Sequence, residues 1–100
     1  MDTNLPNNQQ FNKLYVKHCK HLKLAGYQPK TIEAYSRAIR RIGNYFDCKL
    51  NNLSQDQLLD YFHDLVQSHS WNTVKLDLYG LQFFYTQVLQ KTWEHIPLVK

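Results

Sequence analysis

The sequence is poor in glycine, proline and cysteine, and each shortage narrows the choice of fold. Three glycines and three prolines in 100 residues leave few turns for a fold of many strands. The two cysteines, Cys19 and Cys48, fall on separate expected segments, so in a reducing compartment we expect two free thiols. No stretch of about 18 apolar residues occurs, so we expect no helix that spans a membrane.

Acidic residues are nearly missing from the first half of the chain. Residues 11–46 carry eight Lys and Arg side chains against the single acid Glu33, a net charge of +7. Residues 47–69 carry one lysine against four aspartates, a net charge of −3. We therefore expect one part of the domain to attract anions and another part to repel them.

Known catalytic motifs are also lacking. There is no Gly-rich phosphate loop, no nucleophile elbow and no HExxH motif, so we expect neither enzymatic activity nor a cofactor. His18 and His21 flank Cys19, but helical spacing turns His18 about 100° away from Cys19, and no CxxC pair accompanies them. We expect no metal site here, and we expect His18 to be partly buried and hydrogen-bonded.

Apolar residues at three- and four-residue spacing predict four helices and no strands. We expect these helices at about Gln9–Leu24, at Lys30–Phe46, from the Ser54 cap to the connector at residues 68–70, and at about Trp71–Lys91. Ser54 with Gln57 has the form of a capping box, and Ser70 can cap the last helix. Gly80 costs helix stability, which a close approach of two helices would explain. The predicted fold class is all-α, a small four-helix bundle.

Charged side chains lie on the outward faces of these helices. On the third helix the apolar face is expected to hold Leu58, Leu59, Phe62, Leu65 and Val66. The aspartates of that helix recur at four-residue spacing on its opposite face, which we expect to be a solvated surface turned away from any polyanion: Asp56, Asp60 and Asp64. The first two helices carry lysine and arginine stripes, and the fourth carries a polar, almost uncharged face.

Three segments resemble one known family. Residues 21–46 (HLKLAGYQPKTIEAYSRAIRRIGNYF), 50–66 (LNNLSQDQLLDYFHDLV) and 70–89 (SWNTVKLDLYGLQFFYTQVL) are similar to the N-terminal core-binding, SAM-like domain of tyrosine recombinases. Residues 83–100 (FFYTQVLQKTWEHIPLVK) are similar to the corresponding stretch of integron- and transposon-encoded integrases. Gln28 stands where that family usually has Ser, so the capping of the second helix is expected to differ.

The resemblance implies a domain organisation and a set of partners. It implies a four-helix SAM-like orthogonal bundle at residues 11–92, after a flexible leader at 1–10. Residues 93–100 would begin a linker to a catalytic domain absent from this sequence. The implied partners are duplex DNA, that catalytic domain and other recombinase protomers in a synaptic complex. The polar leader has no apolar signal-peptide core, so we expect an intracellular protein. The resemblance implies a cytoplasmic, DNA-associated protein of a prokaryote.

The charge pattern and the resemblance together give a set of expected DNA contacts. Family members place their second and fourth helices near the major groove. The expected contacts are Lys13, Lys17, Lys20, Lys30, Thr31, Arg37, Arg40, Arg41, Asn72, Thr73, Lys75 and Tyr79. The alternative is a protein-interaction bundle whose basic face docks an acidic partner, and the sequence leaves both open.

Overall fold

The computed structural model describes residues 9–93, and every regular element among them is helical. The elements are α1 (Gln9–Leu24), α2 (Pro29–Tyr45), α3 (Gln55–Ser68), α4 (Trp71–Phe83) and a π-helical turn, η1 (Phe84–Val88). The predicted all-α class and its four helices are confirmed. Most of the expected leader and nearly all of the expected linker lie outside the described residues.

Local signals in the sequence set where the helices begin. The Ser54 hydroxyl accepts a hydrogen bond from the Gln57 backbone N–H at 3.1 Å, and the Gln57 side chain accepts one from the Ser54 N–H at 2.8 Å. This is the predicted capping box of α3. Ser70 caps α4 by accepting from the Thr73 N–H. Gln28 gives α2 no side-chain cap, and that helix starts on Pro29, which needs no N–H partner.

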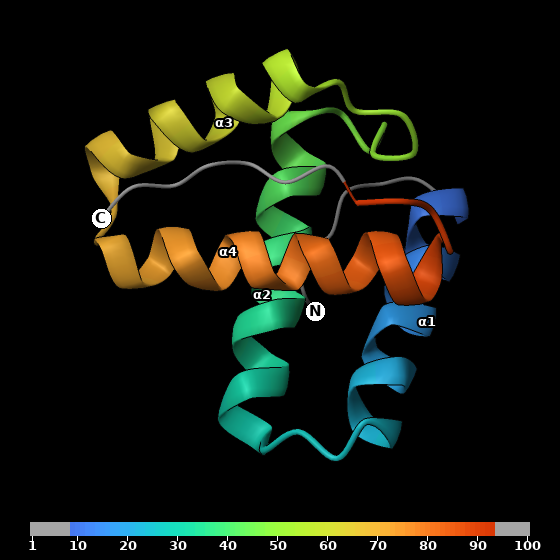
Figure 1. Ribbon diagram of the computed structural model, residues 1–100. Helices are drawn as coiled ribbons and strands as arrows, with labels where there is room; N and C mark the ends of the chain where they lie inside the picture. Colours follow the sequence, from blue (N-terminus) through green and yellow to red (C-terminus); the bar gives the residue numbers. More distant parts are fainter. Residues whose placement is uncertain (1–8, 94–100) are drawn as a thin grey trace.

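The four helices form two pairs that cross each other. α1 and α2 run side by side in opposite directions, and α4 crosses them, with α3 packed beside α4 (Figure 1). The α2–α4 crossing is close at Gly80, where an added Cβ would lie 3.1 Å from the Cβ of Ala38 and 3.2 Å from the Tyr35 carbonyl oxygen. The predicted close approach at Gly80 is confirmed.

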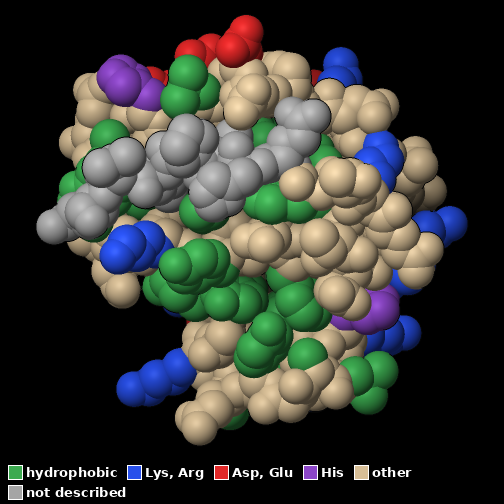
Figure 2. Space-filling view, viewed as in Figure 1, with side chains coloured by type: hydrophobic (Ala, Val, Ile, Leu, Met, Phe, Trp, Pro, Cys, Tyr) green, Lys and Arg blue, Asp and Glu red, His purple; other side chains and the backbone are tan. Residues whose placement is uncertain are grey.

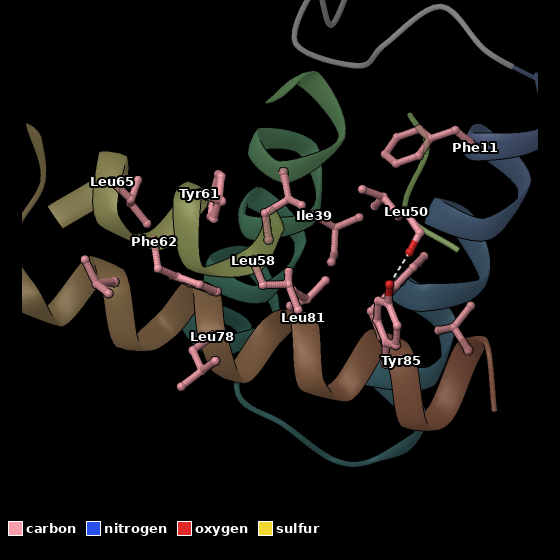
Figure 3. Close-up of a cluster of buried hydrophobic side chains, with 14 residues drawn as sticks. Phe11, Ile39, Leu50, Leu58, Tyr61, Phe62, Leu65, Leu78, Leu81 and Tyr85 are labelled. Atoms are coloured by element: carbon pink, nitrogen blue, oxygen red, sulfur yellow. Dashed lines mark hydrogen bonds between the residues drawn. The ribbon is translucent and has the colours of Figure 1, made fainter. Parts of the chain in front are cut away.

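The core lies between the two helix pairs (Figure 3). On α3 the buried side chains are Leu58, Tyr61, Phe62 and Leu65. The expectation for Leu59 was wrong, because that side chain is 54% exposed. Tyr61 takes the core position because it lies three residues after Leu58 and four before Leu65, on the same side of the helix.

The fourth helix changes its geometry near its end. α4 stops at Phe83 rather than continuing regularly to Lys91, and η1 follows with wider π-helical turns. The Tyr85 hydroxyl of η1 donates to the Leu50 carbonyl and accepts from the Leu53 N–H at 3.1 Å (Figure 3). The π turn therefore anchors the α2–α3 loop to the core. No helix within residues 9–93 has the length and apolar character needed to span a membrane.

Candidate nucleic-acid interface

Charges of opposite sign occupy different parts of the surface. Asp56, Asp60 and Asp64 are all exposed on α3, and Figure 2 shows acidic side chains gathered over that helix, at the top of the view. Most basic side chains in this view lie away from it, along the right-hand side over α1 and towards the lower left (Figure 2). Lys13, Lys17 and Lys20 of α1 are all exposed. The acidic and basic surfaces meet at one place, where the Tyr45 hydroxyl of α2 donates to Asp64 Oδ2 at 2.6 Å and Arg41 lines the same shallow hollow as Asp64.

The arginines of α2 surround one surface hollow, which we call the arginine hollow. It is lined by Arg37, Arg40, Arg41 and Asn44. The Arg37 side chain is 55% exposed, whereas those of Arg40 and Arg41 are only 14% and 25% exposed. Sequence reasoning placed all three on a freely exposed face. The structure keeps them together but seats two of them against neighbouring helices.

Arg41 is held by an acid that sequence reasoning did not identify. Its Nη1 donates to both carboxylate oxygens of Asp77, at 2.6 and 2.8 Å, and the Tyr61 hydroxyl donates to Asp77 Oδ2 at 2.7 Å. Asp77 is 1% exposed. Burial opposes the charge of Arg41, but the hydrogen bonds and charge of Asp77 outweigh burial, so the pKa of Arg41 is raised. This network joins α2, α3 and α4.

Arg40 is held on the other side of α2 by α1. Its Nη1 donates to the Tyr15 hydroxyl at 2.6 Å, and its guanidinium lies 5.9 Å from the centre of the Tyr15 ring. Burial raises the pKa of Tyr15, although the hydrogen bond from Arg40 partly offsets this. Glu33 lies at the edge of the same cluster, 3.1 Å from Arg37 and 3.6 Å from Arg40. The hollow therefore combines three cations with two nearby carboxylates.

The expected contacts on α4 and at the start of α2 are mostly accessible. Lys30, Asn72 and Lys75 are exposed, and Thr31 is half-buried. Tyr79 is 48% exposed and lines a second hollow with Tyr27, Tyr35 and Phe83. Thr73 is half-buried at the start of α4. Its hydroxyl accepts a hydrogen bond from Ser70 at 3.3 Å, within the cap of α4.

His18 is hydrogen-bonded, as predicted, but it is more deeply buried than expected. It is fully buried, and its Nε2 lies 3.2 Å from the Tyr35 carbonyl oxygen, between the edges of Phe83 and Phe84. Burial lowers its pKa to about 4, the hydrogen bond to Tyr35 acting weakly in the other direction. The neighbouring Cys19 turns to Ser36 of α2 instead, with Sγ 3.4 Å from the hydroxyl. Within residues 9–93, no three His, Cys, Asp or Glu side chains gather as metal ligands would.

Comparison with protein families decides what this bundle is. Residues 14–95 match a family described as the N-terminal SAM-like domain of phage integrases. The chain belongs to this family. The resemblance seen in the sequence is confirmed, and the crossed helix pairs are the SAM-like bundle of an integrase domain. Comparisons with curated proteins and with solved structures gave no match.

Two residues that organise this integrase domain, Tyr15 and Asp77, were missed by sequence reasoning. Asp77 had a usable signal, because it sits between the core residues Val74, Leu78 and Leu81 in the apolar part of α4. An acid in such a position requires a buried cationic or hydrogen-bonding partner. Tyr15 gave no such signal, since a tyrosine in an apolar stripe is common.

Proposed function

We propose that residues 11–92 bind duplex DNA as the core-binding module of a site-specific tyrosine recombinase. A catalytic domain beyond residues 93–100 would cleave and rejoin the strands, and other protomers would assemble with it in a synaptic complex. The proposal rests on family membership and on one observation above all. The arginine hollow gathers the arginines of α2, while the exposed aspartates stand on α3.

The proposed binding mode uses α2 and α4 together. These helices cross at Ala38 and Gly80. The parts of each helix that lie away from the crossing can therefore contact the two walls of one DNA groove. Side chains of Arg and Lys on both helices would bind phosphates, and Asn72 and Tyr79 would reach base edges. Lys13, Lys17 and Lys20 of α1 would add attraction over a longer range. Most of the affinity should therefore be independent of DNA sequence.

The test is the binding of the full chain to a fluorescent DNA duplex, measured by anisotropy at several salt concentrations. With about five phosphates contacted, the logarithm of the binding constant should fall by about 4.5 for each tenfold rise in salt. Replacing Arg37, Arg40 and Arg41 together by Gln should remove most of the binding. Circular dichroism must show that this triple variant keeps its helices.

The matched control is Lys49→Gln, which removes one positive charge from the exposed α2–α3 loop. It should bind almost as well as the parent chain. The proposal fails if the parent chain does not bind duplex DNA, or if salt leaves binding unchanged.

An acidic protein partner on the same basic face is the second candidate, and a competition experiment separates the two. If DNA is the ligand, polyglutamate should release bound duplex only at charge concentrations far above those of unlabelled duplex. Equal potency of the two polyanions would favour an acidic protein, because an extended acidic chain reproduces charge without phosphate geometry.

A further inference from the structure

Every arginine of this chain lines the same hollow, and two of the three are fixed in place. The sequence contains three arginines, and these are Arg37, Arg40 and Arg41. No lysine of the described residues lines the hollow. Arg40 is tied to Tyr15 of α1, and Arg41 is tied to Asp77 of α4. Neither side chain has to be ordered when a ligand arrives, unlike a lysine on an open helix face.

We propose that the arginine hollow is a preorganised site for one phosphate group of the DNA backbone, and that Tyr15 and Asp77 are its positioning residues. This rests on the proposed DNA-binding function and adds to it. The affinity at this point would come from the orientation of guanidinium groups, and not simply from the number of positive charges.

The balance of charges around the arginine hollow indicates that affinity depends more on the orientation of its side chains than on its net charge. Glu33 and Asp77 place two carboxylates against the three arginines, so the cluster keeps only a modest excess of positive charge. A site that worked by charge alone would do better without Asp77, a buried carboxylate that holds Arg41 in place. A guanidinium presents N–H donors in a rigid fork that matches two phosphate oxygens, and an oriented fork loses little entropy on binding. Asn44 adds an amide at the rim of the same hollow.

Substitution of Tyr15 separates the effect of arginine orientation on DNA binding from the effect of net charge. The Tyr15→Phe variant keeps the ring and the net charge, and removes only the hydroxyl that accepts from Arg40. We expect duplex binding to weaken about three- to tenfold at fixed salt, which corresponds to the net contribution of one ordinary hydrogen bond. We expect Arg40→Lys, which keeps the charge but not the fork, to lose nearly as much as Arg40→Gln. Arg40→Gln should also reduce the salt slope by about 1.

Tyr85→Phe is the matched control, because it removes a buried hydroxyl bonded to Leu50, outside the arginine hollow. It should bind DNA like the parent chain even if it melts at a lower temperature. The proposal that the hollow is preorganised for phosphate is refuted if Tyr15→Phe and Arg40→Lys bind DNA like the parent chain while Arg40→Gln binds it weakly. That result would leave the proposed function intact.

A titration with inorganic phosphate tests the hollow without DNA. The three arginine Nε–H signals in a ¹⁵N spectrum should shift together with one apparent Kd, and Tyr15→Phe should raise that Kd. Independent shifts with different midpoints, or no change in Tyr15→Phe, would overturn the site. Absence of duplex binding with a phosphate response preserved would overturn the proposed function instead.

Discussion

Asp77 shows how one buried acid can organise a basic surface. It accepts hydrogen bonds from Arg41 and Tyr61 and so neutralises a guanidinium that would otherwise lack a partner against the core. Burial and the neighbouring Asp77 charge together raise the pKa of Tyr61, so its hydroxyl stays protonated and keeps donating. A buried pair of this kind is valuable mainly for specifying geometry, since its net contribution to stability is small.

Because His18 is buried, the free energy of unfolding should depend on pH in the acidic range. Its folded-state pKa of about 4 lies below the ordinary value of 6.5, so between these values the unfolded chain binds more protons than the folded chain. The free energy of unfolding should therefore be constant above pH 6.5 and fall as the pH drops towards 4, by about 3 kcal/mol at most. Urea denaturation at pH 7, 6, 5 and 4.5 measures this.

The control for this prediction is His18→Gln, which cannot titrate at that position. Carboxylates also titrate near pH 4, so the difference between the two proteins isolates the histidine. Parallel curves for the parent and His18→Gln would show that protonation of His18 carries no penalty.

At the scale of the helix, the crossing of α2 and α4 depends on small residues. Ala38 and Gly80 bring the two backbones together, and the Tyr35 carbonyl lies at the same point. Gly43 serves the α1–α2 contact in the same way, because an added Cβ there would lie 2.6 Å from the Phe11 ring. The angle between the helix pairs, and hence the position of α4 relative to the arginine hollow, follows from these contacts.

Gly80→Ala should therefore destabilise the domain although alanine favours helix more than glycine does. The gain in helix propensity is about 1 kcal/mol, and overpacking against rigid neighbours costs about 2 kcal/mol. We expect a net loss of about 1 kcal/mol in the free energy of unfolding, measured by urea titration. In the Ala38→Gly background, Gly80→Ala should cost less than it does in the parent chain, since the clash with the Ala38 Cβ is removed. Additive effects of the two substitutions would argue against direct contact.

For the whole molecule, the separation of charges determines which acids matter for binding. Glu33 lies within hydrogen-bonding distance of Arg37, whereas Asp60 projects from α3. Each substitution, Glu33→Gln or Asp60→Asn, removes one exposed negative charge. Their different positions make them a matched pair for testing where DNA binds.

Glu33→Gln should strengthen duplex binding about threefold at low salt, and Asp60→Asn should have a smaller effect, because screening weakens a charge on a distant helix. Anisotropy titrations of both variants at two salt concentrations measure the difference. An equal or larger gain from Asp60→Asn would place the DNA near α3 and contradict the proposed orientation.

Features that depend on neighbours along the chain follow from the amino-acid sequence alone. Ser54, Gln57 and Ser70 begin their helices through contacts three residues away, and apolar spacing shows which faces are buried. The family can also be identified from the sequence, because the segments typical of it occur in the expected order and spacing. These local interactions would form much the same way in many folds.

Which arginines are held, and by which partners, follows only from the way the helices pack in the folded domain. Arg41 meets Asp77 36 positions later, and Arg40 meets Tyr15 25 positions earlier. Helical spacing alone placed both on an open face, because it cannot show how closely α1 and α4 approach the edges of α2. That approach depends on the packing at Ala38, Gly43 and Gly80, where small side chains let backbones come near. The packing of α1 and α4 against α2 thus holds two of the three arginines in fixed positions.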